Sequence, residues 1–183
     1  AYHTGVMAKY VFEGIARVPV EVDLASEYRY RDPIFDRNTL VIIVSQSGET
    51  ADSLAALRES KANGQRVLGI VNVVGSSIAR EADNVMYTWA GPEISVATTK
   101  AYSAQLASFY LLAMKFGKVR KALADSDYEQ MIGDLQQLPG MMEELLKDRQ
   151  QIQRFANRYL AAEHIFFIGR GIDYAISMEG DRK

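Results

Sequence analysis

The chain has 183 residues, of which 48% are hydrophobic and 24% charged, and its formal net charge is −2. This composition is ordinary for a globular protein, and the length allows one complete domain, or one domain and part of another. The charge and the lack of a Lys/Arg run disfavour nucleic acid as a partner, and no apolar stretch is long enough to span a bilayer. Because cysteine is absent, disulfides, thiol catalysis and Cys-ligated metal are excluded. We therefore expect a cytoplasmic protein that acts away from membranes.

The two histidines do not have metal-binding spacing. His3 and His164 lie far apart, and the chain has no H-x-x-x-H or H-E-x-x-H pattern. We expect His3 to be a polar residue at the start of a helix, and His164 to lie on the surface at the entrance to a strand. No metal or redox cofactor is indicated.

Apolar spacing and turn residues predict that strands and helices alternate along the first two thirds of the chain. In chain order we expect a helix at 2–16, a strand at 19–24, a polar and aromatic segment at 25–32, a strand at 40–44, a helix at 51–61, a strand at 67–71, a short helix at 74–82, a strand at 85–87, a loop at 91–99 and an amphipathic helix at 100–116. From residue 40 onward the order is βαβαβ, which predicts parallel strands with right-handed crossovers.

The character of the chain changes after residue 116. We expect a linker at 117–126, a helical segment at 128–160 that breaks at Pro139-Gly140, and a further strand at 165–168. A methionine-containing stripe on the helical segment should face the core, because such stripes are core more often than cofactor sites. Its members are Met131, Leu135, Leu138, Leu145 and Leu146.

The most informative stretch is LVIIVSQSGETADSLAALR, residues 40–58. A buried strand ends at four hydrogen-bonding side chains and a glycine, and a helix follows directly. In open parallel sheets this position binds ligands, and free N–H groups at a helix start attract anions. The turn lacks the lysine of a Walker loop, so neutral donors on Ser45, Gln46, Ser47 and Thr50 suit a phosphate monoester. Helix capping alone explains a lone SxSGxT about as well, although a cap needs only one such residue.

Two further polar turns follow later strands. GPEISVATTKAY opens a helix with Thr98 and Thr99 as candidate caps and Lys100 in the first turn, and VNVVGSSIAREAD contains a serine pair. If the strand at 85–87 pairs near the strand at 40–44, these turns reach one crevice. Together they favour a small polyhydroxylated anion as ligand. For Glu93, the one carboxylate in GPEISVATTKAY, we expect a structural hydrogen bond.

The end of the chain contains GRGIDY, which partly matches a dinucleotide fingerprint. Tyr174 stands where that fingerprint needs its third glycine, so we disfavour a dinucleotide. The first residues, AYHTGVMAKY, and the last, GIDYAISMEG, each place a tyrosine before a helical pattern. Two similar α/β units, the second incomplete, would explain this echo, and we expect the sequence to be a piece of a longer protein.

Four segments together resemble one enzyme family. VSQSGETADSLAALR, VNVVGSSIAREAD, GPEISVATTKAYSAQL and VDLASEYRYRDP are similar to the isomerase domain of glutamine–fructose-6-phosphate aminotransferases, which have sugar isomerase (SIS) folds. The resemblance implies an α/β fold, namely a SIS-type three-layer αβα sandwich with a parallel, flavodoxin-like sheet. It also implies a first SIS subdomain at 1–117 that lacks its first strand, a helical connecting segment at 118–163, and the start of a second, truncated SIS subdomain at 164–183.

The resemblance implies roles for particular residues. The family's phosphate-binding turn falls on Ser45, Gln46, Ser47 and Thr50. The family's loop whose backbone contacts the sugar falls on Val96 and Ala97. Its arginine that stabilises enolate-like charge corresponds to Arg170, and its lysine implicated in ring opening corresponds to Lys183. Ala1 stands where the family has a phosphate-contacting serine, and Asp181 and Arg182 replace small or apolar residues.

The resemblance implies that the parent protein makes glucosamine-6-phosphate from fructose-6-phosphate and glutamine, in amino sugar biosynthesis. Ammonia from a glutaminase domain of the same parent chain would condense with the open-chain ketose, and a carboxylate would move a proton between C1 and C2. We expect a homodimer, and we expect the 183 residues to be inactive alone. A sugar-phosphate deglycase or ketose isomerase, a sugar-phosphate-sensing regulatory module and a purely structural interaction domain remain alternatives.

Overall fold

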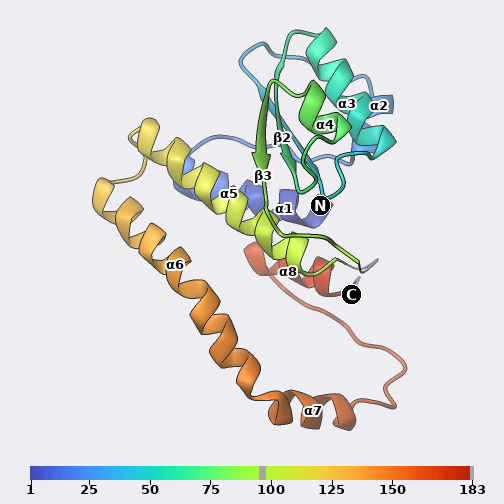
Figure 1. The fold of residues 1–183 in the computed structure, drawn as a ribbon, viewed down its shortest axis with the longest axis vertical. Coiled ribbons are helices and arrows are strands. Elements are labelled where there is room, and N and C mark those ends of the chain that lie inside the picture. Colours follow the sequence, from blue (N-terminus) through green and yellow to red (C-terminus); the bar gives the residue numbers. More distant parts are fainter. Residues whose placement is uncertain (95–97, 182–183) are drawn as a thin grey trace.

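A computed structural model describes residues 1–94 and 98–181 of the chain. Its helices and strands follow one another around a single small sheet (Figure 1). They are α1 (Tyr2–Val11), the π-helix η1 (Phe12–Ala16), α2 (Ala25–Tyr30), β1 (Leu40–Ser45), α3 (Ala51–Ala62), β2 (Arg66–Val71), α4 (Ser77–Glu81), β3 (Asn84–Tyr87), α5 (Lys100–Val119), α6 (Asp125–Lys147), α7 (Arg149–Arg158) and α8 (Ile172–Asp181).

The sheet is parallel, with the order β1-β2-β3, as the βαβαβ pattern predicts. Its register brings the ends of the strands together, because Ser45 lies opposite Val71 and Val71 lies opposite Tyr87. The strands β1 and β3 do not pair with each other, since β2 lies between them. The turns after β1 and β3 therefore lie on either side of the segment that follows β2.

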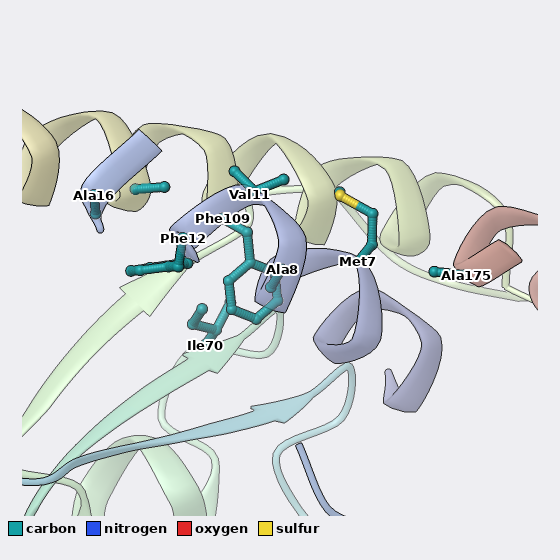
Figure 2. Close-up of a cluster of buried hydrophobic side chains, with 9 residues drawn as sticks. Met7, Ala8, Val11, Phe12, Ala16, Ile70, Phe109 and Ala175 are labelled. Atoms are coloured by element: carbon teal, nitrogen blue, oxygen red, sulfur yellow. The ribbon is translucent and has the colours of Figure 1, made fainter. Parts of the chain in front are cut away.

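Helices cover both faces of the sheet, which confirms the three-layer αβα fold. On one face α1, η1 and α5 bury Met7, Val11 and Phe109 against Ile70 of β2 (Figure 2). On the other, α3 and α4 bury a second cluster that includes Val71. Successive residues of a strand point to opposite faces, so two neighbours in β2 serve the two separate cores.

Two predicted strands are wrong. Residues 19–24 form no strand, because side chains of the preceding helices take up backbone groups there: Lys9 Nζ donates to Val20 O at 2.9 Å, and Val20 N donates to Glu13 Oε1 at 3.2 Å. Residues 165–168 belong to no strand in the described part of the chain, and their apolar side chains are exposed. A strand needs a neighbouring strand, and sequence pattern alone does not provide one.

The helical segment after residue 124 also differs from expectation. α6 runs unbroken through Pro139, and the break falls at Asp148, which caps α7 by accepting a hydrogen bond from Gln151 N at 3.1 Å. A proline removes one helical hydrogen bond, and a long helix can absorb the loss. The predicted core stripe of α6 is wrong as well, since none of its described residues is buried. Figure 1 shows α6 and α7 extending away from the sheet.

These exposed apolar side chains predict self-association of the chain. Leu145 of α6 is 73% exposed, and Phe166 and Ile168 in the segment before α8 are 84% and 90% exposed. Large apolar side chains left exposed favour contact with another copy of the chain. We expect oligomers in sedimentation velocity at micromolar concentration, and about tenfold weaker association in Leu145→Glu, which places a charge in the contact.

The matched control for this prediction is Gln136→Glu, which adds the same charge on the opposite side of α6. A monomeric wild type, or equal effects of the two substitutions, would contradict a contact through the apolar side of this helix.

Candidate functional site

The turn after β1, residues 45–50, folds back on its first serine. Ser45 Oγ accepts a hydrogen bond from Gly48 N at 3.0 Å and lies 3.2 Å from Thr50 Oγ1, while Ser47 Oγ accepts from Glu49 N at 3.2 Å. Gly48 has a φ of 69°, in the left-handed region that favours glycine. The structure thus brings the predicted residues of this turn together at the carboxyl edge of the sheet.

The hydroxyls of the 45–50 turn do not cap the next helix. Thr50 is the N-cap residue of α3 by position, and within the described structure no side chain makes a capping hydrogen bond there. Ser47 instead closes a two-residue hydroxyl turn. The first N–H groups of α3 are therefore available to an anion. In the turn that precedes them, Ser45 is buried and Thr50 is exposed.

The predicted third ligand turn, at the serine pair, is occupied from within. Glu49 Oε1 accepts a hydrogen bond from Ser77 N at 2.8 Å, so the Glu49 carboxylate fills the start of α4. Hydrogen bonds from Ser77 hold the pKa of Glu49 below its ordinary value, and the nearby Arg80 charge lowers it further. This turn consequently supports the 45–50 turn, with Ile78 N also donating to Gly48 O at 3.0 Å.

Sequence reasoning missed Asn72, which directly follows the central strand. Its backbone N donates to Gln46 O at 3.1 Å, in the 45–50 turn. Its side chain bonds to residues 88–91, which follow β3: Oδ1 accepts from Thr88 Oγ1 at 3.1 Å and from Ala90 N at 2.8 Å, and Nδ2 donates to Gly91 O at 2.8 Å. The available signal was its position, since a polar residue directly after a buried parallel strand stands at the ligand edge.

The second predicted loop is partly described. Glu93 accepts a hydrogen bond from Thr98 Oγ1, which confirms the expected structural hydrogen bond, and Lys100 Nζ donates to Pro92 O. Thr99 is the N-cap of α5 by position, again without a capping side-chain bond among the described residues. Val96 and Ala97, predicted to contact the sugar, lie outside the described residues.

One of the two predicted catalytic residues, Arg170, lies in the described part of the chain. Arg170 is exposed in the segment before α8, and Lys183 lies outside the described residues. α8 packs against α1 (Figure 1). Between these helices His3 Nδ1 lies 2.8 Å from Glu179 Oε2, and both side chains are largely buried. The expectation of a simple polar residue at a helix start was therefore incomplete for His3, while His164 is exposed as predicted.

Other classes of site are not found where the chain is described. Over residues 1–94 and 98–181 no group of three or more His, Cys, Asp or Glu side chains could hold a metal ion. Within the same ranges, no helix combines the length and apolar character needed to cross a membrane. The arrangement offers neutral hydroxyl and N–H donors at one sheet edge, a chemistry that suits a phosphate group on a polar ligand.

Comparisons with known proteins identify relatives of the chain. The model of the SIS domain family matches residues 1–115. The chain is 54% identical over all 183 residues to the glutamine–fructose-6-phosphate aminotransferase [isomerizing] of Clostridium acetobutylicum, and 52% identical to that of Caldanaerobacter subterraneus subsp. tengcongensis. It spans 30% of the length of each of these relatives.

Solved structures show the same likeness. The C-terminal domain of glucosamine-fructose-6-phosphate aminotransferase from Francisella tularensis matches with a TM-score of 0.94 and 38% identity, over 98% of this chain and 51% of that chain. A glucosamine-6-phosphate deaminase from Thermotoga maritima matches with a TM-score of 0.61 at 23% identity, over 72% of this chain and 40% of that chain, and shows the fold alone. The resemblance found in the sequence motifs is confirmed.

The packing around Gly48 predicts a large cost for a side chain at that position. An added Cβ would collide with Ser76 Oγ and lie 2.6 Å from Ser76 Cβ, on a backbone already at positive φ. We expect Gly48→Ala to lower the free energy of unfolding by about 2–4 kcal/mol in urea titrations.

Gly64→Ala is the control for this substitution, because Gly64 has a φ of 79° and nothing within 4 Å of its added Cβ. It should lose only the backbone part, about 1 kcal/mol. Equal losses in the two variants would show that the contact with Ser76 does not constrain the turn.

The Glu49 contact predicts a pH-dependent contribution to stability. Because folding lowers the pKa of Glu49, its carboxylate stabilises the fold above the pKa of the unfolded chain, and this stabilisation is lost as the pH falls through the lower folded pKa. We expect Glu49→Gln to be less stable than wild type at neutral pH, with the difference shrinking under acid conditions in thermal unfolding.

The exposed Glu143 on α6 provides the control, and Glu143→Gln should leave the pH profile close to that of wild type. A stability difference for Glu49→Gln that stays constant down to acid pH would rule out this linkage.

Proposed function

The chain belongs to the SIS domain family, and on that premise we propose that it binds the phosphate group of fructose-6-phosphate as part of the isomerase domain of a glutamine–fructose-6-phosphate aminotransferase. The observation that carries the proposal is the 45–50 turn. It gathers hydroxyl and N–H donors at the carboxyl edge of the sheet, beside a helix start without a side-chain cap among the described residues. The likeness to these aminotransferases extends over the whole chain.

The hydrogen-bond directions in the turn indicate which groups would meet the phosphate. Ser47 Oγ accepts from Glu49 N, so its own proton is left to donate to an outside acceptor. Ser45 Oγ already accepts from Gly48 N and shares a contact with Thr50 Oγ1, so of those two hydroxyls one proton can point outward. Donation from neutral groups to a phosphate dianion is charge-assisted, and therefore stronger than an ordinary hydrogen bond.

The proposed reaction needs more than phosphate binding. Ammonia from glutamine would condense with the carbonyl group of the open-chain ketose to form an imine, with loss of water, and a proton would then move from C1 to C2 to give the amino aldose. Arg170 before α8 is proposed to stabilise the enolate-like charge that develops between these steps, and Lys183 to assist ring opening. Val96 and Ala97 are proposed to contact the sugar through their backbone.

The parent protein is proposed to include a glutaminase domain that supplies the ammonia, and to act as a cytoplasmic homodimer. Glucosamine-6-phosphate, the proposed product, would enter amino sugar biosynthesis. By the family resemblance, the carboxylate that moves the proton lies outside these 183 residues. We therefore propose that the chain alone binds the sugar phosphate without converting it, and detectable turnover of fructose-6-phosphate with ammonia would contradict this.

Calorimetric titration with fructose-6-phosphate tests the proposed binding. We expect the wild-type chain to bind fructose-6-phosphate and not to bind unphosphorylated fructose, because the phosphate supplies the contact with the turn. Ser47→Ala should weaken binding at least about tenfold, since it removes a hydrogen bond to a charged group.

Ser126→Ala, an exposed serine in the first turn of α6, is the control and should bind like wild type. Binding that does not need the phosphate, or that is indifferent to Ser47→Ala, would refute a phosphate site at the 45–50 turn.

A further inference from the structure

We propose that Asn72 is a positioning residue that joins the 45–50 turn to the 88–94 loop, so that binding of a sugar phosphate at the turn also affects the surroundings of Trp89. This inference rests on the proposed function, because it takes the 45–50 turn as the phosphate site. It assigns to Asn72 the role of fixing the distance between two ligand-facing segments.

The contacts of Asn72 divide between the two segments. Its main chain holds the 45–50 turn through Gln46 O, at 3.1 Å. All three of its side-chain bonds go to the other segment, where Thr88, Ala90 and Gly91 lie 2.8–3.1 Å away. Both polar atoms of the amide are thus engaged on one side, and the backbone N–H on the other.

The position of Asn72 follows from the register of the sheet. Ser45, Val71 and Tyr87 lie opposite one another across β1, β2 and β3, and Asn72 is the first residue beyond the central strand. A residue at this point has a strand end on each side, about one strand spacing away. Position alone therefore allows Asn72 to reach both neighbouring segments.

The loop that Asn72 holds is in a conformation that needs external support. Trp89 has a φ of 52°, unusual for a bulky non-glycine residue, and Gly91 has a φ of 72°. The Trp89 side chain is 74% exposed, so burial of the indole contributes little to holding this shape. The amide of Asn72 binds the backbone directly after Trp89, at Ala90 N and Gly91 O.

Trp89 also makes the loop observable, because it is the only tryptophan in the sequence. Its ring centroid lies 5.6 Å from that of Tyr87, the last residue of β3. A change in the backbone of the 88–94 loop alters this ring contact and the hydration of the indole. Intrinsic fluorescence of the chain therefore reports on the loop without any need for catalytic activity.

Inorganic phosphate and fructose-6-phosphate separate a positioning role from a general structural one. Phosphate alone occupies only the turn, whose link to Asn72 runs through the main chain and survives side-chain removal. In the proposed complex, the sugar of fructose-6-phosphate would extend from the turn toward the 88–94 loop. Loss of the Asn72 side chain should therefore weaken binding of the sugar phosphate and spare binding of phosphate.

The experiment uses the 183-residue chain, with calorimetry and tryptophan fluorescence on wild type, Asn72→Ala and Thr88→Val. Thr88→Val removes one bond to Asn72 Oδ1 with little change of shape, and keeps the test available if Asn72→Ala fails to fold. We expect Asn72→Ala to shift the emission of the ligand-free chain, and to bind fructose-6-phosphate about tenfold more weakly and inorganic phosphate within about twofold of wild type. Thr88→Val should give an emission shift and a fructose-6-phosphate affinity between those of wild type and Asn72→Ala.

Asn63→Ala is the matched control, because Asn63 Nδ2 donates to Glu59 O at 2.9 Å at the far end of α3. It should match wild type in emission and in both affinities. Unchanged emission in Asn72→Ala and Thr88→Val, or equal weakening of both ligands, would overturn the positioning role while wild-type binding still supports the proposed function. Failure of wild type to bind fructose-6-phosphate would overturn the proposed function itself.

Discussion

The in-register ending of three parallel strands is the constraint on which the candidate site depends. Ser45, Val71 and Tyr87 lie opposite one another, so the polar segments that follow them start from one edge. A shift of a single residue in β2 would turn its apolar side chains to the wrong faces and move Asn72 away from Gln46 and Gly91. The geometry of the site therefore depends on the packing of the sheet. The central strand β2 contributes most to that packing, because Val67, Ile70 and Val71 are fully buried.

Hydrogen bonds between the turns convert this alignment into a single unit. Gly48 O and the Glu49 carboxylate bind the start of α4, and Gln46 O binds Asn72. The backbone of the 45–50 turn is thus held from two neighbouring segments while its hydroxyls stay at the edge. Such preorganisation lowers the ordering cost of binding, since a ligand meets donors that are already in place.

The features that sequence could predict are those encoded locally. LVIIV followed by SQSGET predicts a strand, a turn and a helix from the local pattern alone, and the short apolar runs at 67–71 and 85–87 each predict a strand. What sequence could not predict depends on partners distant in the chain. His3 pairs with Glu179 from the opposite end, and Glu49 reaches Ser77 across 28 positions. Residues 19–24 and 165–168 have strand-like patterns, yet in the described structure no strand pairs with them, and the apolar stripe of α6 has no surface to cover it.

The different fates of two helix starts explain how a turn containing a carboxylate can still suit an anion. Both α3 and α4 begin at the same edge, and each offers free N–H groups. Glu49 belongs to the turn before α3, but its side chain crosses to α4, where it accepts a hydrogen bond from Ser77 N and lies near the positive charge of Arg80. The negative charge of Glu49 therefore lies at the start of α4, the shorter helix. The start of α3 keeps its N–H donors, since no side-chain cap binds them in the described structure, and the Asp52 carboxylate in its first turn is paired with Arg29 at 3.3 Å. This end of the helix can therefore still stabilise the charge of a phosphate.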